Sequence, residues 1–302
     1  MQCHPHTTMK LLIPCSAAAS PQAIIHDLEY AGLPSQSHAL LLLPKRHHAM
    51  TPVLEIAQLR ETSRKAHGYH PYEQLLEIDE EDKRIRAALL DHFPNWFIEF
   101  ESDERVSALE SKPSQGSILE AARAWRADMI LLGSERRDRS RDSLQSLSRI
   151  ASEAPCSVRI VHPRYQHPDA PLQLMAYIDG TEQSVHLIEG FASRPFPRNT
   201  RLHLMSVVSK REKEIGIIHQ MLDYFAEHLR QEFPHIESQI RYGDPVEQIL
   251  HYVEQQEIDS IFLPTTSAPE NARIQTAILV AQHAETTVEI FRYSKTSRHS
   301  AH

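Results

Sequence analysis

The chain has few of the residues on which several common kinds of protein depend. Only eight of its 302 residues are glycine, and three are cysteine. Glycines let backbone N–H groups approach phosphates, so this chain has little material for phosphate-cradling loops. Cys3, Cys15 and Cys156 are odd in number and widely spaced. That pattern favours reduced, structural thiols over a disulfide framework or a zinc site with paired cysteines.

Long apolar runs and an excess of positive charge are also missing. No uncharged apolar stretch reaches the roughly 18 residues that a bilayer span needs. The formal net charge is −8, which gives no electrostatic reason to approach nucleic acid or an anionic membrane. The N-terminal residues hold too short an apolar stretch for a secretory signal. We therefore expect a cytoplasmic protein that binds neither nucleic acid nor membrane.

Signatures of nucleotide-dependent enzymes are absent as well. We find no SGGxDS-type pyrophosphate loop, no HIGH-like sequence, no Walker loop, and neither GxGxxG nor GxSxG. The 20 histidines form no full ligand set at the spacing of known metal sites. The sequence thus predicts no catalytic residues and no metal cofactor, although acids and bases that converge only in space stay open.

What the sequence does have is an internal repeat. Residues 116–134, GSILEAARAWRADMILLGS, parallel residues 243–265, GDPVEQILHYVEQQEIDSIFLPT. In both, an amphipathic helix leads into a short apolar run, with Asp128 and Asp259 at equivalent places. Such a run after a helix is typical of a fully buried parallel strand.

Strands alternate with helices through each half, which implies βαβ units and parallel sheets. We predict an α/β fold in which each half contains a five-stranded parallel sheet flanked by helices. The ten strands are expected near residues 10–14, 39–44, 96–100, 129–132, 158–161, 174–178, 201–208, 236–240, 260–263 and 288–291.

The repeat also predicts the domain limits. The first domain spans residues 9–163 and carries an insertion at about residues 45–72, whose role the sequence leaves open. Residues 164–171 are proline-rich and polar, as expected of a linker. The second domain spans residues 172–294.

The order of these segments resembles a tandem member of the universal stress protein (UspA-like) family. The resemblance rests on ADMILLGS, EAPCSVRIV, IDGTEQS and GDPVEQIL, and it covers nearly the whole chain. It implies a flavodoxin-like, doubly wound fold with a ligand crevice at the carboxyl ends of the strands. It also implies that residues 158–161 pair antiparallel with residues 288–291, so that the two domains form an intrachain pseudo-dimer. Further association into a homodimer stays open.

The resemblance implies an adenine nucleotide (ATP, ADP or AMP) as the ligand. In the second half Asp179, Gly180 and Thr181 stand where the family keeps an acid and a turn, and Val208 closes the strand beside which adenine would lie. Asp-Gly after a strand is also simply a good turn. The following phosphate loop contains no glycine, although hydroxyls such as those of Thr265 and Ser267, together with Arg273, could still bind phosphate.

The first half has the opposite defect. Gly133 and Ser134 open its loop as the family does, but Cys15 replaces the acid. Arg136 stands near the family's second glycine. Its guanidinium could pair with a phosphate, or the loop could be a solvated mixed-charge segment.

Neither half therefore has the complete nucleotide site. We predict a non-catalytic universal-stress-type protein, active in stress response or adenine-nucleotide sensing, with degenerate phosphate loops and weak or absent binding. The alternative is a protein-interaction scaffold without a small ligand, because a fold can persist after its site decays. A nucleotide-dependent enzyme is the third reading.

Overall fold

The computed structural model describes residues 8–15, 21–44, 80–103, 113–133, 140–162, 170–208, 212–265 and 272–293. The predicted insertion at 45–72 and most of the predicted linker lie outside these residues. The limits of the two domains stay a prediction.

All ten predicted strands are present. The elements of the first half are β1 (Lys10–Pro14), α1 (Pro21–Tyr30), β2 (His38–Pro44), α3 (Glu80–His92), β3 (Phe97–Asp103), α4 (Gln115–Trp125), β4 (Met129–Gly133), α5 (Arg141–Glu153) and β5 (Ser157–Val161). Those of the second half are β6 (Gln173–Tyr177), α6 (Glu182–Ser193), β7 (Arg201–Val208), α7 (Glu212–Leu229), β8 (His235–Tyr242), α8 (Pro245–Gln255), β9 (Ser260–Pro264), α9 (Ala272–His283) and β10 (Thr287–Phe291).

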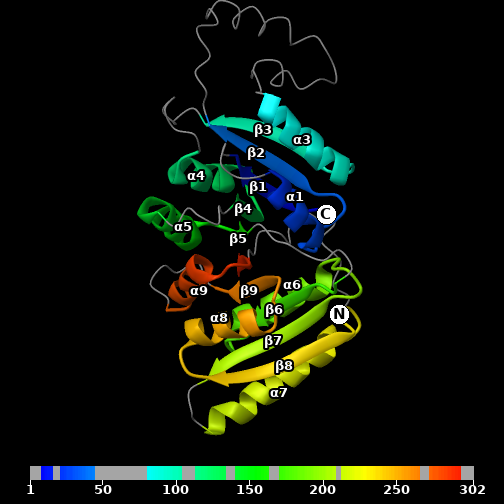
Figure 1. Ribbon diagram of the computed structural model, residues 1–302, viewed down its shortest axis with the longest axis vertical. Coiled ribbons are helices and arrows are strands. Elements are labelled where there is room, and N and C mark those ends of the chain that lie inside the picture. The colour runs from blue at the N-terminus through cyan, green and yellow to red at the C-terminus, as the bar shows by residue number, and fades with distance from the viewer. Residues whose placement is uncertain are drawn as a thin grey trace, which may run out of the picture.

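The strands form one ten-stranded sheet in the order β3-β2-β1-β4-β5-β10-β9-β6-β7-β8. Every pairing is parallel except that of β5 with β10, which is antiparallel and joins the halves in the middle of the sheet (Figure 1). At this seam Val158 faces Ile290, Ile160 faces Val288, and Arg159 faces Glu289. The predicted α/β fold and its intrachain pseudo-dimer are thus confirmed.

Equivalent contacts in the two halves confirm the internal repeat. Asp128 accepts a hydrogen bond from the backbone N–H of Lys10 at 2.9 Å, and Asp259 accepts one from that of Gln173 at 2.6 Å. Lys10 and Gln173 are the first residues of β1 and β6. Each aspartate directly precedes the fourth strand of its half, and its hydrogen bond therefore links that strand to the start of the first strand.

Local signals account for where the helices start. Asp244 caps α8, because its carboxylate accepts a hydrogen bond from the N–H of Glu247 at 3.1 Å, and Pro245 occupies the first turn, where a missing N–H costs nothing. Ser114 caps α4 in the same way. Within the described residues, no helix is long and apolar enough to cross a membrane.

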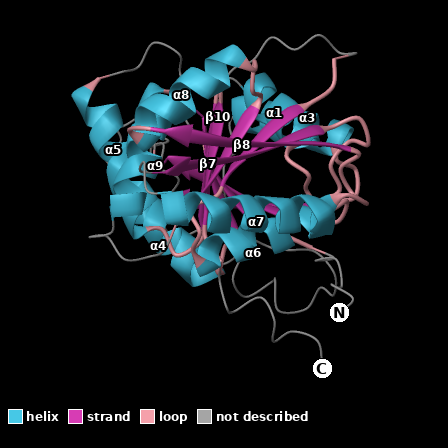
Figure 2. Cartoon of the chain, turned by 90° about the horizontal axis from the view of Figure 1, so that it is seen from below, coloured by secondary structure: helices cyan, strands magenta, loops and turns pink. Residues whose placement is uncertain are grey.

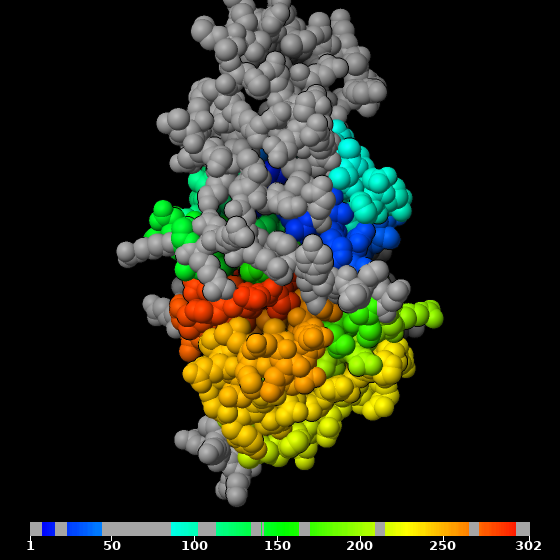
Figure 3. Space-filling model, in the orientation of Figure 1, coloured from blue at the N-terminus to red at the C-terminus, as the bar shows by residue number. Residues whose placement is uncertain are grey.

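The two faces of the sheet are covered differently. Helices α4, α5, α8 and α9 pack side by side, and the apolar residues beneath them form one cluster that runs across both halves. On the other face α1 and α3 cover the first half while α6 and α7 cover the second, with a separate apolar cluster under each pair. Seen along the long axis, the twisted strands cross in the middle with helices around them (Figure 2). In the space-filling view the C-terminal segment of the described chain lies between the halves (Figure 3).

Candidate functional site

The candidate site lies at the carboxyl ends of β6 and β9, which are neighbours in the sheet. From these ends the chain runs into α6 on one face and α9 on the other. A point where adjacent parallel strands send their connections to opposite faces is where open α/β sheets bind ligands. Asp179 follows β6, Thr265 follows β9, and Arg273 is the second residue of α9.

Asp179 holds the turn between β6 and α6. Its Oδ1 accepts hydrogen bonds from the backbone N–H of Thr181 at 3.1 Å, the Thr181 hydroxyl at 2.6 Å and the Ser184 hydroxyl at 2.7 Å. The Ser184 hydroxyl in turn accepts from the N–H of Asp179 at 3.1 Å. Gly180 has a φ of +76°, a left-handed conformation that glycine adopts at little cost. The predicted Asp-Gly turn is therefore present, with one carboxylate oxygen engaged by its own turn.

The other carboxylate oxygen of Asp179 faces α9. Arg273 Nε lies 2.6 Å from Asp179 Oδ2, and this ion pair links the turn after β6 to the helix after β9. The Asp179 side chain is 7% exposed and that of Arg273 is 46% exposed. Burial, followed by the charge of Asp179, raises the pKa of the nearby Tyr177 hydroxyl to about 12. The site thus presents a partly exposed guanidinium above a nearly buried carboxylate.

Two further predicted residues of the second half, Val208 and Thr265, lie at the carboxyl ends of strands β7 and β9. Val208 ends β7 and is 8% exposed. Thr265 is 1% exposed, and its N–H donates to the carbonyl oxygen of Phe291 at 3.0 Å. Thr265 therefore extends the pairing of β9 with β10 by one residue, and its side chain is buried. Ser267 lies outside the described residues.

The corresponding point of the first half lies between β1 and β4. Gly133 ends β4 and is exposed. Cys15, where the second half has Asp179, is 7% exposed, and its thiol lies 3.7 Å from the carbonyl oxygen of Ile13. Ser134 and Arg136 lie outside the described residues. A buried thiol cannot replace the carboxylate, so the described part of this half supplies no acid at that point.

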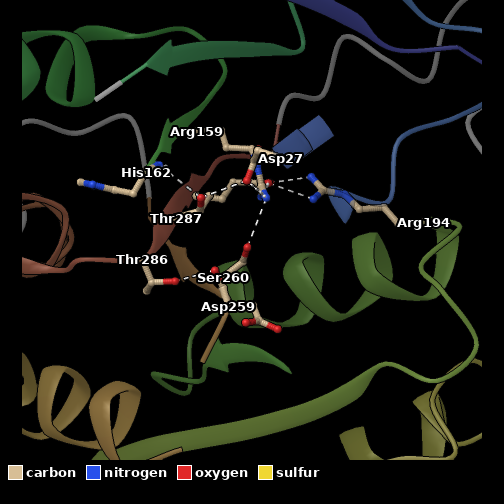
Figure 4. A network of polar contacts seen from close by, with 9 residues as sticks. Asp27, Arg159, His162, Arg194, Asp259, Ser260, Thr286 and Thr287 are labelled. Carbon is tan, nitrogen blue, oxygen red and sulfur yellow. Dashed lines mark hydrogen bonds and ion pairs between the residues drawn. The ribbon is translucent and has the colours of Figure 1, made fainter. Parts of the chain in front are cut away.

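A second polar cluster, which the sequence analysis did not anticipate, lies at the seam between β5 and β10 (Figure 4). Arg159 is fully buried and donates to both carboxylate oxygens of Asp27, at 2.7 and 2.9 Å, and to Glu289 at 3.1 Å. Arg194, directly after α6, donates to both carboxylate oxygens of Glu289, at 3.0 and 2.5 Å.

Two hydroxyl groups also form hydrogen bonds with the charged groups of this cluster. The Ser260 hydroxyl accepts from Arg159 at 3.2 Å, and the Thr287 hydroxyl donates to Asp27 at 2.9 Å. Burial alone would raise the pKa of Glu289, but the charges and hydrogen bonds of Arg194 and Arg159 outweigh it and hold that pKa below its usual value. The only sign of this cluster in the sequence is a charged residue at the middle of each seam strand, in SVRIV and TVEIF.

No group of three or more metal-ligating side chains gathers among the described residues. The closely spaced histidines His4 and His6, His47 and His48, and His67 and His70 lie outside that part of the chain.

Comparison with known proteins identifies the fold. No model of a protein family and no curated protein matches the chain. Among solved structures, a universal stress protein from Archaeoglobus fulgidus DSM 4304 aligns with a TM-score of 0.58 at 14% identity, covering 97% of this chain and 99% of that one. The chain has the fold of a tandem universal stress protein.

Two further structures agree with this fold. A protein of unknown function from Pseudomonas aeruginosa PAO1 aligns with a TM-score of 0.58 at 13% identity, covering 97% of this chain and 96% of that one. A protein from P. aeruginosa UCBPP-PA14, provisionally named a universal stress protein, aligns with a TM-score of 0.54 at 12% identity, covering 94% and 92%. At sequence identities this low, the structural similarity establishes the fold alone. Function therefore has to be argued from the site.

Proposed function

We propose that the chain is a non-catalytic universal-stress-type protein that senses adenine nucleotides weakly, at the carboxyl ends of β6 and β9 in its second half. The observation that supports this proposal is the Asp179–Arg273 pair at the carboxyl ends of β6 and β9. Asp179 is the acid that the family resemblance implies after the first strand of the second half. Arg273 is a cation in the first turn of α9, the helix whose start would face the phosphates of a nucleotide.

The chemistry of the pair indicates how an anion would bind. Without glycines in the loop before α9, backbone N–H groups cannot cradle a triphosphate closely. A guanidinium can replace part of that cradle, because it binds phosphate oxygens with two parallel hydrogen bonds. Arg273 is half exposed and already lies at the start of α9, where the helix dipole favours negative charge.

The same contacts predict that binding is weak. A phosphate has to compete with Asp179 for the Arg273 guanidinium, which lies 2.6 Å from the carboxylate. The other oxygen of Asp179 already accepts three hydrogen bonds from Thr181 and Ser184, so it has little capacity left for a ribose or a base. The ligand therefore gains new contacts only by giving up existing ones.

Absence of catalysis is part of the proposal. General acid–base chemistry needs a group that can give or take a proton at the reacting atom. Asp179 is tied to its turn and to Arg273, and a guanidinium group is a poor proton donor or acceptor. These roles are those of a binding site that holds a ligand without converting it.

A protein-interaction role is the second candidate, and one observation favours it. Ile217 and Tyr224 lie seven residues apart on α7 and are 67% and 68% exposed. Residues at this spacing share one face of a helix, so α7 presents two large apolar side chains on the same exposed face.

The experiment that separates the candidates starts from chain purified without added nucleotide. The protein is denatured and the released small molecules are analysed by mass spectrometry, followed by calorimetric titration with ATP, ADP and AMP in the presence of magnesium. An adenine nucleotide in the released fraction, or a titration signal that Arg273→Gln weakens, supports the sensor. No released nucleotide and no heat with any of the three would overturn it and favour the scaffold.

A further inference from the structure

The buried charges at the seam are arranged as unlike partners. The first half contributes Asp27 from α1 and Arg159 from β5, and the second half contributes Arg194, after α6, and Glu289 from β10. In the first half the helix carries the acid and the strand carries the base. In the second half the strand carries the acid, and the base follows the corresponding helix. Each half therefore holds a neutral pair, and the two pairs have opposite polarity.

These pairs meet through the central residues of the seam strands. Arg159 lies directly opposite Glu289 in the antiparallel pairing, and its Nη1 donates across the seam at 3.1 Å. Further hydrogen bonds of this cluster cross the seam, from Arg159 to Ser260 at 3.2 Å, from Thr287 to Asp27 at 2.9 Å, and from the N–H of His162 to the Thr287 hydroxyl at 3.4 Å. Both central side chains are fully buried, so water cannot replace either partner.

The apolar residues beside this central pair cannot tell one half from the other. Val158 and Ile160 flank Arg159, and Val288 and Ile290 flank Glu289. An edge of β-branched residues would pair equally well with a copy of itself. In a like-with-like pairing of the same register, Arg159 would face a second Arg159, or Glu289 a second Glu289. Like charges directly opposite each other destabilise a sheet, and in a buried site neither charge would have a partner across the seam.

A steric feature also joins unlike partners. Gly32, after α1, has a φ of +63°, and the ring of Phe196, after α6, lies so close that a Cβ on Gly32 would come within 2.6 Å of it. The first half thus offers an open space beside its glycine, and the second half offers the ring that fills it.

We propose that the Arg159–Glu289 pair makes the seam selective, so that β5, the last strand of the first half's own sheet, accepts the second half of this chain and rejects another first half. Pairing of identical edges, which would link copies of the chain into open chains of domains, is excluded by charge. The apolar residues supply the affinity of the seam, and the central pair supplies its choice of partner.

Charge reversal in the full-length chain tests this proposal. Arg159→Glu places two acids at the centre of the intrachain seam, and Glu289→Arg places two bases there. A mixture of the two variants offers a way out, because Glu289 of one chain can meet Arg159 of the other. We therefore expect neither variant alone to form a monomer in which its own β5 and β10 pair, and we expect the mixture to form a one-to-one heterodimer.

The two variants, one carrying an affinity tag, are unfolded in urea, mixed, refolded together and examined by native mass spectrometry beside the wild-type chain. The heterodimer should exceed either homodimer at least tenfold. A mixture that behaves as the sum of its two components, whether folded monomers or aggregates, would overturn the proposal, as would an Arg159→Glu chain that stays a monomer of wild-type stability.

Neutral substitutions keep the test decisive where a reversed chain does not fold. Arg159→Met, Glu289→Gln and the double variant remove charge without creating a like-charged pair. If the two residues act on each other across the seam, the double variant shifts the urea midpoint by less than the sum of the single shifts. Additive shifts would contradict the proposal.

Discussion

Removal of the Arg159 guanidinium is the sharpest test of what stabilises the seam. The side chain is fully buried and contacts Asp27 at 2.7 and 2.9 Å, Glu289 at 3.1 Å and Ser260 at 3.2 Å. Breaking a buried ion pair by removing one partner costs about 3–5 kcal/mol, because the other charge stays buried. Glu289 keeps Arg194 at 3.0 Å and Asp27 keeps the Thr287 hydroxyl at 2.9 Å. We therefore expect Arg159→Met to lower the free energy of unfolding by about 3 kcal/mol, the low end of that range.

The assay is equilibrium unfolding in urea, followed by circular dichroism. Arg149→Met is the matched control, because Arg149 forms an ion pair with Glu153 at 3.1 Å with side chains 52% and 45% exposed. Surface pairs of this kind contribute at most about 1 kcal/mol. Equal effects of the two substitutions, or a loss below about 1 kcal/mol for Arg159→Met, would refute the reasoning that burial sets the cost.

Three further predictions follow from buried or partly buried groups. Asp128→Ala and Asp259→Ala each remove an equivalent hydrogen bond to the start of a strand, so each should cost about 1.5–3 kcal/mol in urea unfolding; a large cost for one and none for the other would contradict the repeat. Burial lowers the pKa of His203, so the folded state resists a proton that the unfolded chain accepts, and stability should fall as pH drops below about 6.5, by up to ~1.4 kcal/mol per pH unit. His203→Gln should flatten that fall in urea titrations between about pH 5 and 6.5, whereas the exposed control His251→Gln should not. Burial raises the pKa of the Cys156 thiol to about 12, so alkylation by iodoacetamide, followed by peptide mass spectrometry, should be at least ~1000-fold slower in the folded than in the unfolded chain; comparable rates would show that the thiol is accessible.

Strand positions could be predicted because buried strands carry an unmistakable local pattern. In β5, β9 and β10 every residue is buried, and each follows an amphipathic helix. The pattern fails where burial is incomplete. The edge strand β8 reads HIESQIRY and is mostly exposed, so the predicted range, residues 236–240, was too short at both ends.

The candidate site was only half predictable for a related reason. The turn of Asp179 and Gly180 is local, and the dipeptide predicts it. The ion pair with Arg273 depends on how α9 is placed after β9, and no spacing in the sequence encodes that placement.

The polar cluster at the seam is harder still to predict from sequence patterns. Its side chains come from both halves, and the Thr287 hydroxyl reaches Asp27 across a sequence separation of 260 residues. A charged residue inside a buried strand predicts that a partner exists, but only the antiparallel register of β5 and β10 identifies it. A search for charges at equivalent positions of the two seam strands would have found Arg159 and Glu289.

The most direct test of the proposed function is the affinity of the full-length chain for ATP, measured by calorimetry in the wild type and in Arg273→Gln, with Arg230→Gln as control. Arg230 is also exposed and paired with an acid, at 2.8 Å from Glu227, but it lies beyond the end of α7. A hydrogen bond to a charged group contributes about 1.5–3 kcal/mol, so Arg273→Gln should weaken ATP binding at least about tenfold while Arg230→Gln leaves it unchanged. Equal affinity in all three chains, or no binding in any of them, would contradict a nucleotide sensor built on the Asp179–Arg273 pair.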